Sequence, residues 1–313
     1  MMKNKLNIAM LGGRGYVGQE IISILDNHPN LNLTKVFSSS NAGAQVKNSC
    51  NKDLKFSPLK KSEMNIDGVD VVILAMPNGK AKSYFDLINK INNQIIFIDI
   101  SSDFRTDNAW HYRLPELRKY NGSKTISNPG CYATAMQLSI APIMDLVDGD
   151  INSIGISGYS GAGATPNSRN NQSKLENNLI PYSLSGHAHE NEVRMNLYKQ
   201  IHFSPHVASF FRGILVTSKL KLKKKNSVEN IFNMYKNFYE NSKLINIKKD
   251  IPMINEIINT HTVEIGGFSL DENKQHLTLC CTLDNLLKGA ATQVIQNINA
   301  ACGFDDLTGV NYE

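Results

Sequence analysis

The chain has 313 residues, of which 41% are hydrophobic and 19% are charged, and its formal net charge is +5. This composition is typical of a folded globular protein and excludes a largely disordered chain. The length allows two domains, no apolar run is long enough to span a bilayer, and the mild positive charge favours anionic small molecules over nucleic acid as ligands.

The chain starts with Met1-Met2-Lys3-Asn4-Lys5 and passes directly into an apolar strand pattern. It lacks the long apolar region and the small-residue cleavage site of a signal peptide. The five cysteines are an odd number and form no C-x-x-C pair. Because such a set fits reduced thiols better than a disulfide framework, we expect a cytoplasmic protein.

The first predicted strand, Leu6–Leu11, is followed by a glycine-rich loop and then by a helical pattern that ends near Pro29. The loop fits G-x-G-x-x-G, in which glycines allow a tight turn and close approach of the backbone to a pyrophosphate at a helix N-terminus. A plain turn is the alternative, but the position between a strand and a helix favours a dinucleotide. The residues predicted to bind it here are Gly12, Gly13, Arg14, Gly15, Tyr16, Val17 and Gly18.

The next strand, Leu31–Phe37, ends in Ser38, Ser39 and Ser40 rather than in a carboxylate. An acidic residue at this position usually binds the ribose 2′-hydroxyl of NAD, and it would repel a 2′-phosphate. The serine hydroxyls and Arg14 can instead donate hydrogen bonds to that phosphate. The sequence therefore favours NADP(H), with a simple serine turn as the alternative.

Two apolar runs, Val69–Ala75 and Ile95–Ile98, enclose a predicted helix at about Lys80–Ile91. Continuous apolar runs are typical of strands that are buried on both faces, and their alternation with helices predicts a doubly wound parallel sheet. We therefore predict an α/β Rossmann domain over residues 1–130.

The pattern changes after Cys131. The predicted elements are a helix at 133–146, a strand at 151–157, a polar loop at 164–178, alternating strands at 214–222 and 277–283 with a helix at 226–240 between them, and a final helix at 288–301. They predict an α+β catalytic and dimerisation domain with a mostly antiparallel sheet over residues 131–284, followed by a C-terminal helical segment, 285–313. Lysine alternates with leucine over 219–223, which favours the solvent-exposed face of a strand over a phosphate-binding patch.

The segment Ser127-Asn128-Pro129-Gly130-Cys131 predicts a turn followed by a helix that begins at or just after Cys131. The positive end of the helix dipole favours thiolate over thiol, and a thiolate is the nucleophile that attacks an acyl carbon. The nearby N–H groups can also stabilise the resulting oxyanion. A buried structural cysteine is the alternative, which a dinucleotide loop in the same chain disfavours.

These motifs resemble those of the N-acetyl-gamma-glutamyl-phosphate reductases, particularly the form in fungal bifunctional arginine enzymes, and more distantly those of the aspartate-semialdehyde dehydrogenases. The resemblance covers nearly the whole chain, and the matching segments are Gly12–Gly18, Asp99–Arg105, Tyr112–Glu116, Ser127–Cys131, Ser157–Gly163, His187–Glu192, Arg212–Ile214 and Asp284–Ala291. Two departures are Arg113, where the family has glycine, and Asn78, where it often has histidine.

The resemblance implies that the Cys131 thiolate attacks N-acetyl-L-glutamyl 5-phosphate, and that NADPH reduces the thioester to an aldehyde in arginine biosynthesis. It also implies that the C-terminal segment 285–313 packs back on the first domain. Collapse of the thiohemiacetal needs an acid–base group with a pKa near 7, which points to histidine. His189 is preferred to His187, because Glu192 would share its face on a helix and could orient the imidazole.

Arg105 is the first candidate for gripping an anionic group of the substrate, with an ion pair to Asp99 or Asp103 as the alternative. Further substrate contacts are predicted at Arg212 and Asn128. For the nicotinamide side of the cofactor, the predicted contacts are Pro77, Ser160, Gly161 and Asn285. No metal, nucleic acid or membrane is expected, and an antiparallel sheet pairing across a two-fold axis predicts a homodimer or homotetramer.

Three rival functions remain at this point. Aspartate-semialdehyde dehydrogenase has the same chemistry on a substrate with a free amino group. A reductase for the aminoadipyl homologue differs by one methylene, which provides only about 1–3 kcal/mol of discrimination. A Rossmann-fold sensor would bind NADP without needing Cys131.

Overall fold

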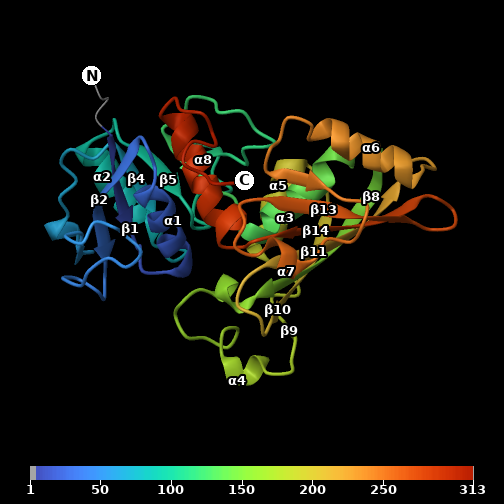
Figure 1. The fold of residues 1–313 in the computed structure, drawn as a ribbon, viewed down its shortest axis with the longest axis horizontal. Helices are drawn as coiled ribbons and strands as arrows, with labels where there is room; N and C mark the ends of the chain where they lie inside the picture. The colour runs from blue at the N-terminus through green and yellow to red at the C-terminus, as the bar shows by residue number, and fades with distance from the viewer. Residues whose placement is uncertain (1–4, 313) are drawn as a thin grey trace. The chain divides into compact units, whose positions relative to one another are not determined.

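The computed structural model describes residues 5–312 of the chain. Residues 1–4, on which the prediction of no targeting segment partly rests, lie outside the described residues. The chain divides into two compact units, drawn in Figure 1: unit 1 is Met1–Gly130 with Ala290–Asn311, and unit 2 is Cys131–Gly289 with Tyr312–Glu313. Over residues 5–312, no helix has both the length and the apolar character needed to cross a bilayer.

Unit 1 is built on a seven-stranded sheet of order β3-β2-β1-β4-β5-β7-β6, in which every adjacent pair is parallel. The strands are β1 (Leu6–Leu11), β2 (Leu31–Ser38), β3 (Phe56–Pro58), β4 (Val71–Leu74), β5 (Ile96–Asp99), β6 (His111–Tyr112) and β7 (Thr125–Ser127). The strand order reverses between β1 and β4, and open α/β sheets bind their ligands at such a switch point, beyond the carboxyl ends of the strands. The predicted Rossmann sheet is confirmed.

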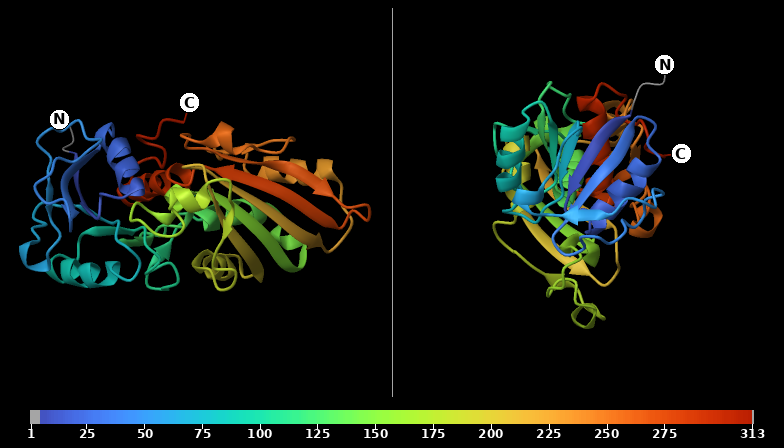
Figure 2. Two further views of the ribbon diagram at one scale, coloured as in Figure 1. Left: turned by 90° about the horizontal axis from the view of Figure 1, so that it is seen from below. Right: turned by 90° about the vertical axis from the view of Figure 1, so that its left-hand side faces the viewer.

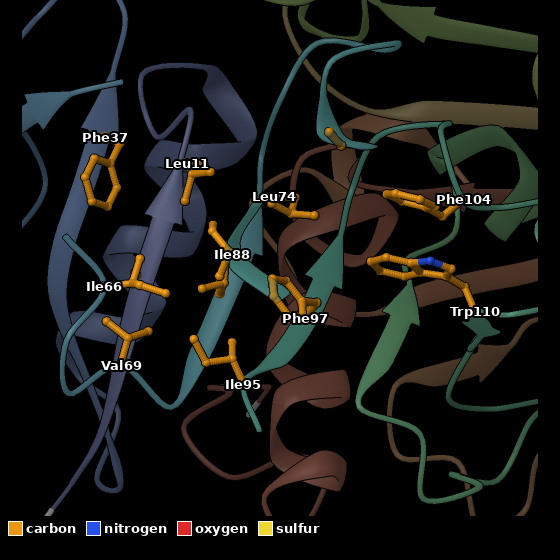
Figure 3. Close-up of a cluster of buried hydrophobic side chains, with 13 residues drawn as sticks. Leu11, Phe37, Ile66, Val69, Leu74, Ile88, Ile95, Phe97, Phe104 and Trp110 are labelled. Carbon is orange, nitrogen blue, oxygen red and sulfur yellow. The ribbon is translucent and has the colours of Figure 1, made fainter. Parts of the chain in front are cut away.

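The helices of unit 1 are α1 (Tyr16–Asp26), α2 (Ala81–Ile91) and α8 (Thr292–Ala301). Helix α8 packs against α1 and β5, so a segment from the far end of the sequence completes this unit. Figure 3 shows the core beneath α2, where Ile88 lies near Leu74 and Phe97. Phe104 stacks on Trp110 with ring centroids 3.9 Å apart. Each such buried side chain contributes about 1.5–3 kcal/mol to stability.

Unit 2 contains the second seven-stranded sheet, of order β12-β13-β14-β11-β8-β10-β9. The strands are β8 (Val147–Gly158), β9 (Ile180–Pro181), β10 (Ile201–Ala208), β11 (Ile214–Leu222), β12 (Ile245–Ile247), β13 (Val263–Leu270) and β14 (His276–Leu283). The pairs β8–β10 and β12–β13 are parallel, and the other four pairs are antiparallel. The prediction of a mostly antiparallel second sheet is therefore confirmed. Lys219 and Lys221 on β11 are exposed while Leu220 is buried, as expected when the lysines lie on the solvent-exposed face of the strand.

The helices of unit 2 are α3 (Cys131–Ile140), α4 (Gln172–Leu175), α5 (Ala188–Leu197), α6 (Val228–Phe238) and α7 (Ile254–Ile257). Every residue of α3 after Cys131 is buried, and the helix packs against β11, β14 and α5. Helix α4 lies in the excursion between β8 and β9, a segment that extends away from the sheet in Figures 1 and 2. Helix α3 is thus a central element, with only its first residue partly open to solvent.

The prediction of one helix over residues 133–146 is wrong. The α-helix ends at Ile140, and a separate 3₁₀ turn follows at Ala141–Leu146. Pro142 explains the break, because proline has no N–H to donate and its ring collides with the carbonyl group four residues earlier.

Candidate active site

The glycine loop joins β1 to α1 at the carboxyl end of the unit 1 sheet. Gly12 has φ = +92°, and a Cβ there would lie 2.1 Å from the carbonyl oxygen of Ala75. A Cβ on Gly18 would lie 2.8 Å from the backbone of Gly13. A Cβ on Gly15, in contrast, would meet no atom within 4 Å. The loop therefore packs tightly at Gly12 and Gly18 while leaving open space at the start of α1, which suits a backbone-bound phosphate.

Two of the predicted 2′-phosphate contacts lie together next to this loop. The Nη1 atom of Arg14 donates to the hydroxyl of Ser40 at 3.0 Å, and both side chains are exposed. Ser38 is buried, and its hydroxyl accepts from the N–H groups of Ser40 and Asn41 at 3.4 and 3.2 Å. Ser38 thus shapes the turn, as the alternative interpretation expected, while Arg14, Ser39 and Ser40 remain at the surface.

The segment that follows β4 is held in place by hydrogen bonds with the motif Asp99–Arg105. The carboxylate of Asp103 accepts from the N–H groups of Gly79 and Ala81 at 2.5 and 2.9 Å and so caps the start of α2. The side-chain oxygen of Asn78 accepts from the N–H of Ser102 at 3.1 Å. Pro77, a predicted cofactor contact, is exposed on this braced segment.

Arg105 braces the turn that precedes the nucleophile. Its Nε donates to the carbonyl oxygen of Asn128 at 3.0 Å, and its Nη2 donates to that of Ile100 at 2.8 Å. Asp99 is fully buried and receives the hydroxyl of Ser101 on both carboxylate oxygens, at 2.8 and 2.9 Å. Burial raises the pKa of Asp99 to about 6, and the Arg105 charge lowers it in part.

Asn128 is a centre of hydrogen bonds within unit 1. It is 1% exposed, and its N–H donates to the carbonyl oxygen of Asp99 at 2.7 Å. Its side-chain oxygen accepts from Asn297 Nδ2 at 3.0 Å, and its Nδ2 lies 3.4 Å from the carbonyl oxygen of Ala290. These contacts fix the turn one step before Pro129-Gly130-Cys131, so the predicted substrate contact also has a clear positioning role.

A buried arginine that the sequence did not identify as functional extends this network. Arg113 is 4% exposed, and its Nη1 donates to the side-chain oxygen of Asn297 at 3.0 Å. Its Nη2 forms an ion pair with Asp306 at 2.5 Å. The residue that departs from the family pattern therefore connects the C-terminal segment to Asn128 through Asn297.

Cys131 is the first residue of α3 and is partly buried. A Cβ on Gly289 would lie 2.9 Å from the Cβ of Cys131, so only glycine lets the turn after Asp284 pack this closely on Cys131. The next residue, Tyr132, is buried and donates its hydroxyl to the carbonyl oxygen of His206 at 2.7 Å. The helix start favours the thiolate through its dipole.

Three of the other thiols are disfavoured as nucleophiles. Burial raises the pKa of Cys302 to about 11 and that of Cys281 far above its usual value. Cys50 is exposed, and a hydrogen bond to the Asp26 carboxylate raises its pKa. Because a raised pKa lowers the thiolate fraction at neutral pH, these groups react slowly.

The two predicted histidines lie at the start of α5. His187 is the N-cap residue, and its Nδ1 accepts from the N–H of His189 at 3.1 Å. The two imidazole centroids are 4.9 Å apart, and the ring of Tyr132 lies 6.3 and 6.1 Å from them. Glu192 is buried on the same helix, one turn after His189. The structure thus brings both histidines close to Tyr132, the residue that follows Cys131.

Sequence reasoning missed Tyr182 and Arg169. The Arg169 guanidinium carbon lies 4.8 Å from the centre of the Tyr182 ring. Burial raises the pKa of Tyr182 to about 12, and the neighbouring Cys131 thiolate raises it as well, whereas Arg169 and Tyr132 lower it. Neither residue was predictable, because Arg169 lies in the polar loop 164–178 and Tyr182 follows a strand of only two residues, β9.

Three predicted nicotinamide contacts gather elsewhere in unit 2. Asn285 Nδ2 donates to the hydroxyl of Ser160 at 2.9 Å, and its side-chain oxygen accepts from the N–H of Gly213 at 2.7 Å. A Cβ on Gly161 would lie 3.8 Å from Asn285 Nδ2. Ser160, Gly161 and Asn285 therefore form one cluster.

The predicted substrate residue Arg212 is engaged by a buried carboxylate. Its Nε and Nη2 lie 2.6 and 3.0 Å from the two oxygens of Asp284, which is fully buried. Asp284 also accepts from the N–H groups of Leu286 and Asn259 at 2.9 and 2.7 Å. Arg212 consequently holds the segment that leads into Gly289. Among residues 5–312, no three His, Cys, Asp or Glu side chains are arranged to hold a metal ion.

Comparison with known proteins gives two family matches. Residues 7–124 match the family described as semialdehyde dehydrogenase, NAD binding domain, and residues 131–285 match semialdehyde dehydrogenase, dimerisation domain. The chain is similar to the N-acetyl-gamma-glutamyl-phosphate reductase of Xylella fastidiosa (strain M23), with 45% identity over 98% of this chain and 95% of that protein. It is also similar to the mitochondrial protein arg11 of Schizosaccharomyces pombe, with 38% identity over 98% of this chain and 35% of that protein.

Among solved structures, the chain resembles aspartate semialdehyde dehydrogenase II complexed with ASA from Vibrio cholerae. The TM-score is 0.79 at 19% identity, over 96% of this chain and 99% of that one. At this identity the likeness establishes the fold of the chain.

Proposed function

The chain belongs to the semialdehyde dehydrogenase family, and from that membership we propose that it is an NADPH-dependent N-acetyl-gamma-glutamyl-phosphate reductase of arginine biosynthesis. It reduces N-acetyl-L-glutamyl 5-phosphate to N-acetyl-L-glutamate 5-semialdehyde. The observation that carries this function is the placement of Cys131 at the start of α3, with His187 and His189 close to the adjoining Tyr132.

The reaction begins with Cys131. Its thiolate attacks the acyl carbon, and a C–S bond forms as the bond from that carbon to the phosphate oxygen breaks, which leaves a thioester and inorganic phosphate. N–H groups at the start of α3 stabilise the oxyanion that develops during the attack. NADPH, when bound, supplies the hydride that reduces the thioester carbon.

His189 serves as the acid–base group. It protonates the developing alkoxide to give a thiohemiacetal and then removes the hydroxyl proton as the C–S bond breaks, which releases the aldehyde and the thiolate. The Nδ1 atom of His187 accepts the N–H of His189 as the cap of α5, and this supports His189 as the group that exchanges the proton. Glu192 on the same helix is proposed to orient it.

The glycine loop and the surface beside it suit the cofactor. The open space at Gly15 would take the pyrophosphate against the start of α1. Arg14, Ser39 and Ser40 would hold the 2′-phosphate that distinguishes NADP from NAD. Pro77, Ser160, Gly161 and Asn285 are the proposed nicotinamide contacts. Arg105, Arg212 and Asn128 are the proposed substrate contacts.

The proposed activity is tested in the reverse direction, as NADP-dependent oxidation of an aldehyde in the presence of phosphate. We expect N-acetylglutamate semialdehyde to be used faster than aspartate semialdehyde or the aldehyde one methylene longer. Faster use of aspartate semialdehyde would falsify the substrate assignment. Equal use of NADP and NAD would contradict the role of Arg14 and the serines.

The nucleophile is tested with Cys131→Ser. We expect this variant to lose nearly all turnover, by about 10³-fold or more, because a hydroxyl group is a far weaker nucleophile than a thiolate at neutral pH. NADPH binding, followed by cofactor fluorescence, should stay unchanged. Full turnover by the variant would point to a different nucleophile.

The dimerisation-domain match supports an oligomer, and we propose a homodimer or homotetramer of the whole chain. Light scattering in solution measures this directly, and a monomer would contradict it. The cytoplasm is the proposed location. Because the fungal relative is named as mitochondrial, imaging of a tagged chain in its own cell is the appropriate test.

A further inference from the structure

We propose that Arg169 binds the phosphate group of the acyl phosphate substrate as Cys131 attacks. The inference rests on the proposed reductase function and adds a phosphate-binding residue that neither the glycine loop nor the nucleophile motif contains. The observation behind it lies within unit 2: the Arg169 guanidinium lies on the Tyr182 ring, and that ring lies close to His187, which neighbours the Cys131–Tyr132 segment.

The loop that carries Arg169 is ordered by its own hydrogen bonds. The N–H of Arg169 donates to the side-chain oxygen of Asn167 at 2.9 Å, and the N–H of Asn167 donates to that of Asn170 at 2.7 Å. Asn167 Nδ2 donates to the carbonyl oxygen of Ala162 at 3.1 Å, and Asn170 Nδ2 donates to that of Gly163 at 2.8 Å. The two asparagines therefore tie Arg169 to the end of the 3₁₀ turn Tyr159–Ala162 that follows β8.

The Tyr182 ring holds the guanidinium close to the nucleophile. A guanidinium 4.8 Å from a ring centroid is at cation–π distance, and stacking on a ring leaves its edge N–H groups available as donors. The Tyr182 ring centroid lies 5.6 Å from that of His187, and the His187 centroid lies 6.3 Å from that of Tyr132, the residue after Cys131. Tyr182 thus neighbours both the Arg169 guanidinium and His187, one of the two histidines close to the Cys131–Tyr132 segment.

Arg169 is better suited than Arg212 to bind a phosphate, because Arg212 is already paired with a carboxylate. Arg212 directs Nε and Nη2 at the two oxygens of Asp284. Arg169 forms no ion pair with a carboxylate anywhere in the described range 5–312, and it is partly exposed. A planar guanidinium offers paired donors that match two phosphate oxygens.

The phosphate is the group that an arginine beside the nucleophile would meet. It is bonded to the carbon that Cys131 attacks, and its negative charge grows as the carbon–oxygen bond breaks. The substrate's carboxylate lies several bonds away from that carbon. Arg169 would therefore bind the phosphate in the acyl phosphate and stabilise it as it leaves.

The reverse reaction tests binding of the phosphate and of the substrate carboxylate separately, because inorganic phosphate and the aldehyde that carries the carboxylate are then independent substrates. We expect Arg169→Gln to raise the KM for phosphate by roughly 10- to 100-fold, as for the loss of charge-assisted hydrogen bonds. The KM values for N-acetylglutamate semialdehyde and for NADP should stay within about twofold of the wild-type values, because the Arg169 guanidinium is proposed to bind neither of them. Arg169→Lys keeps the charge and loses the fork, so its KM for phosphate should lie between those of the wild type and Arg169→Gln.

Lys174→Gln is the matched control. It removes one positive charge from the same excursion, at an exposed residue of α4, and should leave the KM for phosphate unchanged. An unchanged KM for phosphate in both Arg169 variants overturns the inference. So does a selective rise in the KM for the aldehyde, which would assign Arg169 to the carboxylate.

Folding and function are controlled separately. NADP binding and circular dichroism establish whether a variant is folded, and Arg169→Lys gives the decisive measurement if Arg169→Gln does not fold. A wild-type protein that fails to oxidise N-acetylglutamate semialdehyde overturns the proposed function itself. An active wild type with unaffected Arg169 variants overturns only the phosphate assignment.

Discussion

Asp99 shows at the scale of one residue how burial and hydrogen bonding compete. The carboxyl group is buried at the end of β5, and desolvation raises its pKa from 3.8 to about 6 although Ser101 donates to both oxygens. The folded protein therefore binds a proton there more tightly than the unfolded chain does. Between about pH 4 and 6, this group makes stability fall as the pH rises.

Asp99→Asn tests this consequence. The wild type should lose about 2 kcal/mol of unfolding free energy from this group between pH 4 and pH 6.5 or above, and the variant should lack that loss. Urea unfolding of both proteins across this range measures the difference between the two curves. Parallel curves would mean that Asp99 titrates normally.

Single residues also mark the limit of what the sequence could predict. Cys131 and the histidines were predictable because a helix start and a short local motif contain their chemistry. Arg169 and Tyr182 were not, because their proximity depends on how the excursion between β8 and β9 folds. Arg113 was noted only as a departure from a family pattern, and its contacts with Asn297 and Asp306 join residues far apart in sequence.

At the scale of elements, the turn after β14 is fitted to the start of α3. A short π-helical turn, Leu287–Ala291, precedes α8 and contains Gly289, and a Cβ at Gly289 would lie 2.9 Å from the Cβ of Cys131. The two backbones approach this closely only because Gly289 has no side chain. The position of the nucleophile is thus set partly by an element more than a hundred residues away in sequence.

Gly289→Ala should therefore harm both stability and turnover. Overpacking should cost about 1–3 kcal/mol of unfolding free energy, and a shift of the nucleophile by about 1 Å can reduce kcat about 100-fold. Denaturant unfolding and steady-state kinetics measure the two effects. Gly15→Ala is the control, because a Cβ there meets no atom within 4 Å, and it should cost less stability. Wild-type stability and kcat in Gly289→Ala would show that the turn can shift to accept the added methyl group at little cost.

The elements differed in how well the sequence predicted them. The buried strands β1 and β4 and the alternating strand β11 were predictable, because each has at least four residues with a clear burial pattern. Strands β6 and β9 have two residues each, which is too short for any periodicity. The helix after Cys131 was predicted too long because its apolar pattern continues through Pro142 into the 3₁₀ turn.

At the scale of the whole molecule, the two kinds of sheet were predicted from the sequence, since alternating strands and helices give way to alternating strands after Cys131. The C-terminal return was expected from the family resemblance, but the contacts that fasten it were not. They include the ion pair between Arg113 and Asp306, and hydrogen bonds from Asn299 Nδ2 to the carbonyl oxygens of Asp306 and Thr308 at 3.1 and 2.8 Å. Buried polar contacts thus fix the last described turns onto unit 1.

Arg113→Gln should weaken this attachment. The change leaves the partly exposed Asp306 carboxylate and the buried Asn297 side-chain oxygen without their donor, and the cost is about 1–3 kcal/mol of unfolding free energy. Hydrogen exchange of residues 304–310 should become faster, because Asp306 loses its partner. Lys60→Gln removes an exposed ion pair with Glu63 and serves as the control, with an expected effect of less than about 1 kcal/mol. Equal protection of residues 304–310 in wild type and Arg113→Gln would contradict the attachment.

The return of α8 to unit 1 also has a consequence for synthesis on the ribosome. The sheet strands of unit 1 are all made by residue 130, yet the helix that covers α1 and β5 comes only after residues 131–289. At about 5–20 residues per second, the interval is on the order of ten seconds. During that time the nascent first half exposes an apolar face that its own last helix will later cover, and it should be a substrate for chaperones that bind such faces.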